Sequence, residues 1–465
     1  MFRCAFAALL LGTFRAAHAE PWSEPDWAAV GAETGALLSA YLQVDTTNPP
    51  GNELAGARHL ERVLRSAGIS VEVDEFAPGR ANVIGRQPSA RPSGKGAICL
   101  FSHIDVVTAE PNQLTHAPLS GHIDENGVVW GRGALDMKGM GAVELELMLL
   151  LQRASVPLDR DIVFLAVADE EVGNSGALRA VQTWDRIGCS HLVNEGGIGI
   201  QDMFFAGQVV FPISVAEKGF IWGEIVATGE PGHGSTPVPD RAPERLVKAW
   251  QAVAADAPKP VWDPALLQLL GAAGAEHGGL AGAILQRPAL VRLLLRKRLM
   301  GNPLTRAVLT NTVHITGFSG AEAHNVVPGV VRANVDARVL PGTPPERHIE
   351  HIGTLLEGIA GVQFVPGTVT AGNRSPTDDP FYVALATQLS REGEKIAVGP
   401  AVSPGFTDSI HLRPLGVHAY GIVPFILSED ELRTMHGHNE RVSIENLERG
   451  VRVLYRTVVA LAGVQ

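Results

Sequence analysis

Cysteine is scarce in this chain, which has only three cysteines among 465 residues. Cys4 lies in an N-terminal segment with the pattern of a cleaved leader, so Cys99 and Cys189 are the two that remain. This number excludes a metal site built on cysteine ligands. Both remaining cysteines stand beside apolar runs, and we expect two buried free thiols in preference to a disulfide.

Positive charge and long hydrophobic runs are also in short supply. The 38 lysines and arginines are outnumbered by 49 aspartates and glutamates, which gives a formal net charge of −11. A nucleic-acid partner wants a basic face, so we expect none. After the leader no run reaches the roughly 18 apolar residues of a membrane span. A hydrophobic content of 45% still indicates a folded globular protein, and the length predicts two or three domains.

The N-terminus has the three parts of a secretory signal peptide. Arg3 supplies a positive start, residues 5–11 form a short apolar core, and Ala17-His18-Ala19 is a small-x-small cleavage site. Arg15 is an unusual charge near the end of that core, and a wrongly assigned start is the alternative explanation. We expect residues 1–19 to be a signal peptide and the mature protein to be periplasmic or secreted.

The first part of the mature chain alternates helices with short, continuously apolar strands. We expect strands at 97–102, 161–168 and 190–193, each followed by acidic or histidine residues, with helices between them. Such alternation is typical of an α/β fold with a doubly wound, mostly parallel sheet. Ligands bind beyond the carboxyl ends of the strands in these sheets. The third strand is expected to end in Asn194-Glu195-Gly196-Gly197.

From about residue 213 the pattern changes to alternating strands with one solvated face, at 219–228, 310–317 and 330–340. This pattern indicates an α+β lid or dimerisation domain inserted into the first domain. We expect the catalytic domain at 20–212 and 373–465 and the inserted domain at 213–372. Within it, residues 289–300 predict an amphipathic helix, either for a membrane surface or with solvated basic residues.

Several acidic and histidine residues could hold metal ions. His103 and Asp105 stand two apart at a strand end, where a carboxylate can orient a metal-bound histidine; a pair without any metal is the alternative. Glu170 and Glu171 follow the next strand, and one could bind a metal while the other faces a water molecule, or both could be solvated. With Glu195 and His436 these side chains form the ligand set of a hydrolytic zinc pair.

Seven motifs together resemble one known family. They occur in the order S-H-I-D-V-V (102–107), G-R-G-A-L-D-M-K-G (131–139), D-E-E-V-G (169–173), N-E-G-G (194–197), H-N-V-V-P-G (324–329), D-A-R-V-L-P-G (336–342) and H-G-H-N-E (436–440). The chain is similar over nearly its whole mature length to the dizinc metallopeptidase and aminoacylase family of carboxypeptidase G, aminoacylase and desuccinylases. The likeness is greatest to the carboxypeptidase S, or Gly-X carboxypeptidase, branch.

The resemblance implies a metal site with two zinc ions per subunit. His103 and Glu195 would hold one ion, Glu171 and His436 the other, and Asp136 would bridge them. A single aspartate can do so because its two oxygens can each take a different cation. The family also places a cis peptide after its bridging aspartate, here Asp136–Met137.

The resemblance assigns further roles. Glu170 would be the general base, and Asp105 would orient the histidine ligand. His233 would stabilise the oxyanion in the partner subunit's active site, which implies a homodimer. The substrate-binding positions implied are Asn325, Arg338 and Gly405 in the segment 405–409.

One position departs from the family pattern, and another leaves an alternative open. Many relatives carry an acid where Asn194 stands, so here only the following glutamate can be the ligand. His438 competes with His436 for the histidine position, and the first histidine of the motif matches the family.

The sequence therefore predicts an exported dizinc hydrolase that cleaves an amide bond beside a free α-carboxylate. Its substrate would be a short peptide or an N-acyl amino acid. The alternatives are an aminoacylase without peptidase action and a catalytically silent binding protein of the periplasmic type.

Overall fold

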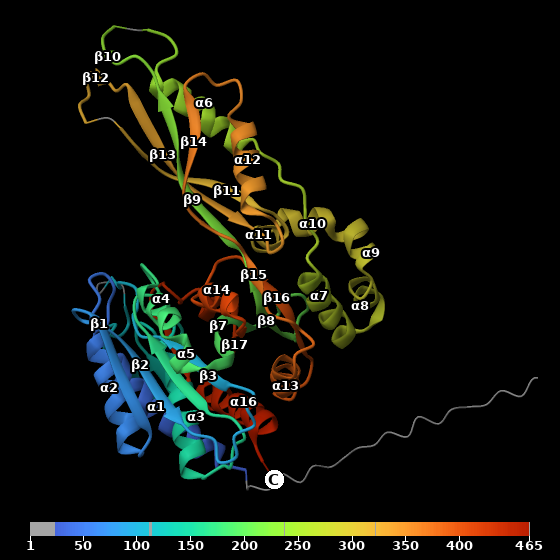
Figure 1. The fold of residues 1–465 in the computed structure, drawn as a ribbon. Helices are drawn as coiled ribbons and strands as arrows, with labels where there is room; N and C mark the ends of the chain where they lie inside the picture. Colours follow the sequence, from blue (N-terminus) through green and yellow to red (C-terminus); the bar gives the residue numbers. More distant parts are fainter. Residues whose placement is uncertain (1–23, 111–113, 237, 321, 465) are drawn as a thin grey trace, which may run out of the picture.

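The computed structural model describes residues 24–110, 114–236, 238–320 and 322–464. The expected signal peptide and Cys4 lie outside these residues. The described chain forms a lobe around a large sheet and an elongated second lobe that rises from it (Figure 1). Among the described residues, no helix is both long enough and apolar enough to span a membrane.

The large sheet has nine strands and confirms the expected α/β class. The strand order is β1-β2-β6-β3-β7-β17-β8-β15, with β16 also paired to β8. The pairs β6–β3, β3–β7, β7–β17 and β8–β16 are parallel, while both ends of the sheet are antiparallel. The strands are β1 (Ser70–Ala77), β2 (Arg80–Gln87), β3 (Ala97–His103), β6 (Ile162–Val167), β7 (Cys189–Gln201), β8 (Val209–Glu217), β15 (Asn373–Arg374), β16 (Ile396–Ser403) and β17 (His418–Leu427).

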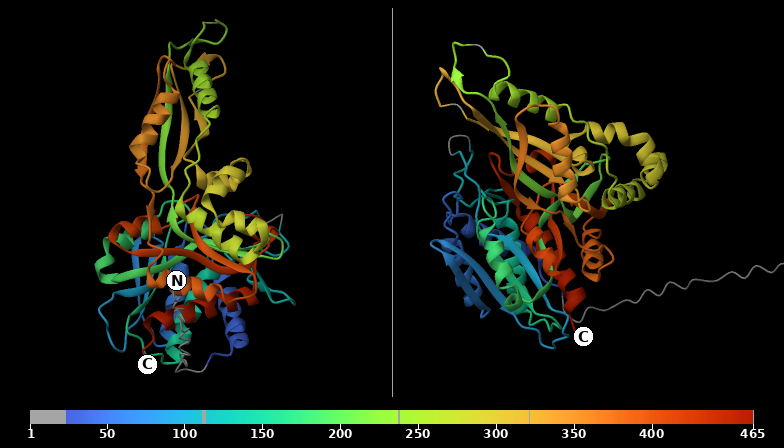
Figure 2. Two further views of the ribbon diagram at one scale, coloured as in Figure 1. Left: turned by 90° about the vertical axis from the view of Figure 1, so that its right-hand side faces the viewer. Right: turned by 45° about the horizontal axis from the view of Figure 1, so that its top comes forward.

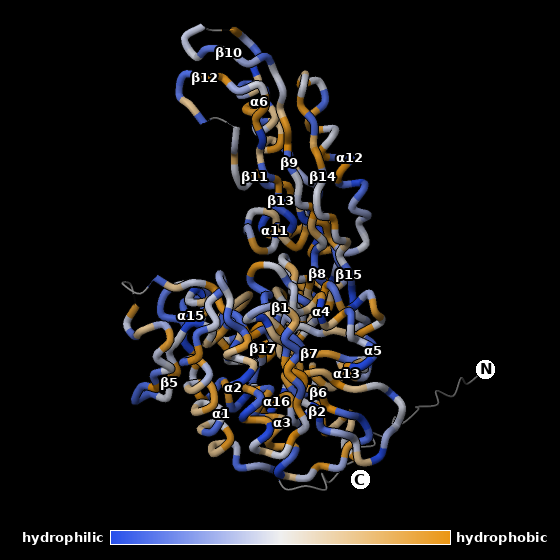
Figure 3. Tube along the Cα trace, turned by 60° about the vertical axis from the view of Figure 1, so that its left-hand side comes forward, coloured by the Kyte–Doolittle hydropathy of each residue, from blue (hydrophilic) through white to orange (hydrophobic). Residues whose placement is uncertain are grey.

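Strand β3 shows why this sheet is buried on both faces. All seven of its residues are buried. Successive side chains of a strand point to opposite faces, so Ile98 and Leu100 enter one hydrophobic core, while Cys99 and Phe101 enter another. Figure 3 shows hydrophobic residues gathered where strands and helices of this lobe meet.

Helices cover both faces of the sheet (Figure 2). The larger core packs under α1 (Trp27–Leu42), α2 (Glu53–Ser66), α3 (Lys138–Arg153), α13 (Pro380–Leu389) and α16 (Ile444–Ala462). The smaller core packs under α4 (Ser175–Gln182), α5 (Trp184–Ile187) and α14 (Ser409–Leu412), which runs into the 3₁₀ turn η3 (Arg413–Leu415).

Cys99 and Cys189 form a disulfide, so the expectation of two free thiols is wrong. The two cysteines are 90 residues apart in sequence, yet their Cα atoms are 5.8 Å apart because β3 pairs with β7. Their burial was expected correctly. Only the order of the strands, which the sequence pattern does not reveal, brings the two sulfur atoms together.

The second lobe contains an antiparallel sheet in the order β11-β13-β9-β14. Its strands are β9 (Gly219–Thr228), β11 (Thr312–Ser319), β13 (Val330–Val339) and β14 (Val362–Thr370). Exposed and less exposed residues alternate along β13. One face packs under α6 (Ala242–Ala254) and α12 (Pro345–Leu355). The short strands β10 (Gly232–His233) and β12 (Val326–Val327) pair at the far tip (Figure 1).

A group of helices lies between the lobes, and of these only the helix at 289–300 was predicted from the sequence. It comprises α7 (Pro264–His277), α8 (Gly279–Leu285), α9 (Pro288–Leu290), the π-helical η2 (Val291–Leu295), α10 (Arg296–Gly301) and α11 (Pro303–Leu309). Helix α7 packs on the large sheet, where Leu269 joins Val210 and Ala397 in a small core. The basic residues of 289–300 are exposed.

A small three-stranded sheet lies beside the large one, in the order β18-β5-β4. Its strands are β4 (His122–Ile123), β5 (Val128–Trp130) and β18 (Arg441–Ser443), and the one-turn helix α15 (Glu429–Leu432) precedes β18. Because β5 ends at Trp130 opposite Arg441, residues 131–136 start next to Glu440.

Candidate metal centre

His103 is the last residue of β3 and is held from both sides of its ring. Its Nδ1 lies 3.0 Å from the backbone oxygen of Asp105 and 3.5 Å from a carboxylate oxygen of the same residue. Its Nε2 lies 3.0 Å from Oδ1 of Asp136. A carbonyl and a carboxylate at Nδ1 favour the tautomer with the proton there, which leaves Nε2 free to bind a cation.

Asp136 presents its two carboxylate oxygens to two different histidines. Oδ1 faces His103, and Oδ2 lies 3.1 Å from Nε2 of His436. The residue sits in the turn that leads into α3, and the peptide bond from Asp136 to Met137 is cis, which confirms that expectation.

Two overlapping groups of side chains could each hold a metal ion. One is His103, Asp136 and Glu195; the other is Asp136, Glu171 and His436. In each group the donor atoms lie within 4.8 Å of one another. Oε2 of Glu171 is 3.3 Å from His436, and its Oε1 is buried without a hydrogen-bond partner. The structure thus brings together the five side chains named as ligands, with one aspartate common to both groups.

The sequence pattern predicted that a strand ends at Glu195, and this prediction is wrong. Strand β7 continues to Gln201, and its pairing with β17 shifts between Asn194 and Gly197. The shift leaves Glu195 and Gly196 as the extra residues of a β-bulge, and Gly196 has φ of +150°. A bulge re-aims a side chain relative to a regular strand, and here Glu195 lies with His103 and Asp136.

Asn194 points into a different network. Its amide donates to the hydroxyls of Thr407 and Ser409 at 3.3 and 3.1 Å, and the side chain is buried. Asn194 therefore fastens the loop of residues 405–409 in this chain.

Asp105 does more than face a histidine ring. Its carboxylate accepts hydrogen bonds from the backbone amides of Glu170 and Glu171 at 3.0 and 3.1 Å, and from the side chain of Asn48 at 2.9 Å. It therefore positions the backbone of both acidic residues. Asn48, which lies in the loop after α1, was not predicted from the sequence.

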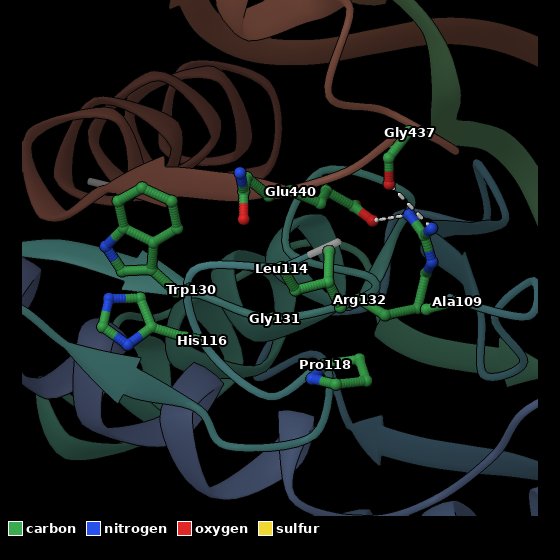
Figure 4. Close-up of a pocket in the computed structure, with 10 residues that line it drawn as sticks. Ala109, Leu114, His116, Pro118, Trp130, Gly131, Arg132, Gly437 and Glu440 are labelled. Atoms are coloured by element: carbon green, nitrogen blue, oxygen red, sulfur yellow. Dashed lines mark hydrogen bonds and ion pairs between the residues drawn. The ribbon is translucent and has the colours of Figure 1, made fainter. Parts of the chain in front are cut away.

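Glu440 was also missed, although it belongs to a recognised motif. Its buried carboxylate accepts hydrogen bonds from the backbone amides of Gly133, Leu135 and Asp136. It also accepts one from the guanidinium of Arg132 at 2.5 Å (Figure 4). Arg132 also donates to the carbonyl of Gly437. One carboxylate thus links the turn that carries the bridging aspartate to the segment that carries His436.

A family model of peptidase family M20/M25/M40 matches residues 99–460, which contain every metal-ligand candidate. The chain belongs to this peptidase family. It is a metal-dependent hydrolase of mixed α/β fold, and the match confirms the resemblance described above.

Two relatives extend the comparison to other M20 proteins. Aminoacylase-1A from Rattus norvegicus is 27% identical over 92% of this chain and 95% of its own length. The probable carboxypeptidase S-like 2 of Dictyostelium discoideum is 27% identical over 78% of this chain and 71% of its length. The family likeness therefore includes both aminoacylases and carboxypeptidases.

Among solved structures, an M20 family metallo-carboxypeptidase from Sulfolobus solfataricus has a TM-score of 0.68 at 17% identity. The match covers 92% of this chain and 98% of the other. At this identity the likeness shows that both chains share the M20 fold.

Glu170 lies beside the two metal groups without belonging to either. Burial, and then the negative charge of Glu195, raises the pKa of Glu170 well above its usual value. Burial, and then the negative charge of Asp136, likewise raises the pKa of Glu195. Clustered carboxylates that resist ionisation are a site where bound cations are favourable.

His233 and Asn325 lie together at the tip of the second lobe, away from the metal groups (Figure 1). His233 pairs with Val326 across β10 and β12, and the backbone oxygen of Asn325 accepts from the amide of Gly234. Both predicted residues are exposed. Within one chain, the structure does not bring them to the metal groups.

Arg338 and Gly405 lie instead near the base of that lobe. Arg338 donates to both carboxylate oxygens of Asp336, and its guanidinium lies 5.3 Å from the ring centre of Phe406, the residue after Gly405. The structure thus divides the predicted substrate-binding residues between the tip and the base.

Proposed function

We propose that this M20 hydrolase cleaves the amide bond beside a free α-carboxylate, acting on N-acyl amino acids or as a carboxypeptidase on short peptides. The observation that carries the proposal is the position of Asp136, whose two oxygens face two separate groups of ligands, with Glu170 next to them. Turnover of a dipeptide series and an N-acyl amino acid series by the metal-loaded protein tests it.

Two zinc ions per subunit fit the donors of the site. Each group offers one histidine nitrogen and two carboxylates, a ligand set typical of hydrolytic zinc. Oε1 of Glu171 is buried and has no hydrogen-bond partner in the protein, which supports the proposal that it binds a metal ion. When bound, such ions make a water molecule acidic enough to attack at neutral pH and polarise the scissile carbonyl.

Glu170 is the proposed general base. It stays outside both ligand groups, so its carboxylate can take a proton from the attacking water and return it to the leaving amine. Asp105 fixes the position of this base through the backbone amide of Glu170. Because Nδ1 of His103 is occupied, its Nε2 is the nitrogen that would bind a cation.

The partner subunit completes the proposed active site. We infer a homodimer in which His233 from one tip stabilises the oxyanion in the other subunit's site. The exposed side chains of Trp250 and Phe318 support this association, since they border an apolar groove of about 410 Å³ on the second lobe. Sedimentation of the purified protein at two concentrations tests the dimer.

Export from the cytoplasm is the proposed location. The signal-like N-terminus supports it, and so does the disulfide between Cys99 and Cys189, because disulfides persist in oxidising compartments. Cell fractionation followed by N-terminal sequencing tests the proposal, with a mature protein that starts at Glu20 as the expected result. Full-length protein in the cytoplasm would contradict it.

A further inference from the structure

An apolar chamber of about 330 Å³ opens directly beside the metal groups. Asp136 and Glu195 line one end of it, and side chains from the large sheet and from helices α7 and α11 line the rest. We infer that this chamber binds a long, unbranched alkyl chain on the acyl side of the scissile amide. The inference rests on the proposed function and adds the class of substrate.

The residues that line the chamber do not suit the amino-acid part of the substrate, which carries the free α-carboxylate. The charged residues that line the chamber are the two metal-ligand candidates Asp136 and Glu195, and both are acidic. The lining offers no lysine or arginine that could pair with a free α-carboxylate, so we expect the amino-acid end to lie outside the chamber. The uncharged acyl group remains as the part that can enter.

The lining also favours an alkyl chain over a peptide. Most of the wall is hydrocarbon, as at Ile198, Phe204, Leu266 and Val308. Each residue of a peptide would bring an N–H and a C=O that need partners, and leaving them unpaired in an apolar chamber is unfavourable. An alkyl chain carries no such groups. By volume the chamber holds on the order of ten carbon atoms, if a methylene takes about the share of a water molecule.

The wall formed by α7 and α11 is firmly built. Leu266 on α7 packs with Leu299 and Leu309 in a separate hydrophobic core within the helical group. The buried Nζ of Lys218 donates to the carbonyls of Ala307 and Thr310, which fixes the end of α11 to the base of the second lobe. Leu304 lines the chamber while it is 73% exposed, so it stands at the mouth.

The experiment measures kcat/KM of the zinc-loaded full-length protein on N-acyl derivatives of one amino acid, with acyl chains from acetyl to hexadecanoyl. We expect kcat/KM to rise two- to fourfold per methylene and to level off near ten carbons, as burial of methylenes predicts. A second series keeps the acetyl group and lengthens the amino-acid side chain, and here we expect little gain.

Two substitutions alter the chamber, and a third, outside it, serves as the matched control. Leu304→Asp places a charge at the mouth, and Val308→Trp fills the space. Both are expected to lower kcat/KM for the decanoyl substrate at least tenfold and to leave the acetyl substrate within twofold. Leu293→Asp changes a leucine on the same helical group that is 76% exposed and outside the chamber, and we expect no effect.

A binding measurement tests the chamber without requiring that any amide is cleaved. Decanoate is titrated against a fluorescent fatty-acid probe on wild type and Val308→Trp. Displacement by decanoate that Val308→Trp weakens supports the chamber even if no amide is cleaved, whereas absent hydrolysis of every amide refutes the proposed function. Efficient cleavage of acetyl substrates without any gain from longer acyl chains overturns the chamber inference alone, and so does a gain confined to the side-chain series.

Discussion

The carboxylate of Glu440 accepts a hydrogen bond from the backbone amide of Asp136 at 3.0 Å, although the two residues are 304 positions apart. The same oxygen accepts from Leu135, and the other oxygen accepts from Gly133 and Arg132. The turn that carries the proposed bridging ligand is thus held by a buried carboxylate that belongs to neither metal group. Its role is to position a ligand.

Replacing Glu440 with glutamine tests this positioning role. The variant keeps the shape but removes the charge that pairs with buried Arg132, and breaking a buried ion pair costs about 3–5 kcal/mol. We expect an unfolding free energy lower by about 3 kcal/mol and a zinc affinity lower by about 10–100-fold. Urea denaturation and a competitive zinc titration measure the two effects.

Glu429→Gln is the matched control, because Glu429 lies 11 residues upstream in the same segment and makes only an exposed pair with Arg433. It should leave both quantities unchanged. Glu440→Gln protein that unfolds and binds zinc like wild type would show that the turn needs no carboxylate.

Substitution of the adjacent residues Glu170 and Glu171 should affect different properties of the enzyme. Glu170→Gln removes the proposed base and is expected to lower kcat by about 10²–10⁴ while both zinc ions stay bound. Glu171→Gln alters a ligand of the second group and is expected to lower the zinc content as well. Atomic absorption on dialysed protein, beside steady-state rates, separates the two. Full turnover in Glu170→Gln would rule out this base.

Removal of the metal should destabilise the protein, because Asp136, Glu170 and Glu195 then face one another without a cation. Returning zinc at 100 times its Kd should stabilise by about 2.7 kcal/mol. His436→Ala should keep one ion, since the group of His103, Asp136 and Glu195 is intact, while His438→Ala should keep two. An equal loss in both variants would contradict the assignment of the first histidine.

Mixed dimers can show whether the tip serves the other subunit. Glu170→Gln and His233→Ala proteins are each expected to be nearly inactive alone. After mixing and exchange of subunits, a dimer of one of each should regain activity, because the intact base of one chain then meets the intact His233 of the other. Sites completed within one chain would give no recovery.

Local pattern was enough to predict much of the fold. The continuous apolar run at 97–102 lies in β3, and the alternating run at 219–228 coincides with β9. Burial on both faces explains the apolar run of β3, whereas the burial of β9 does not alternate along the strand. The candidate ligands were found because their motifs are compact, with the chemistry and the turn residues side by side.

What the sequence did not reveal depends on contacts between distant segments. The pairing of Cys99 with Cys189 follows from the neighbouring positions of β3 and β7, and the bulge at Glu195 follows from the pairing with β17. Glu440 ends the H-G-H-N-E motif, but nothing local shows which groups its carboxylate contacts. In each case the deciding neighbour is 90 or more residues away in sequence.

The burial of Lys218 predicts how the free energy of unfolding changes with pH. It stands between β8 and β9, where the second lobe begins, and its side chain is buried. Burial, and then the positive charge of Arg338, lowers its pKa to about 7. An unfolded lysine has a pKa of about 10.4, so between these two values the unfolded chain holds a proton that the folded chain has lost.

Stability should therefore rise with pH above 7, since ΔG of unfolding increases wherever the unfolded state binds more protons. The contribution of Lys218 has a ceiling of about 1.4 kcal/mol per pH unit. We expect urea denaturation from pH 7 to 9.5 to give a steeper rise for wild type than for Lys218→Met, with exposed Lys259→Met matching wild type. Parallel curves for wild type and Lys218→Met would mean that the ammonium stays charged among its three oxygen partners.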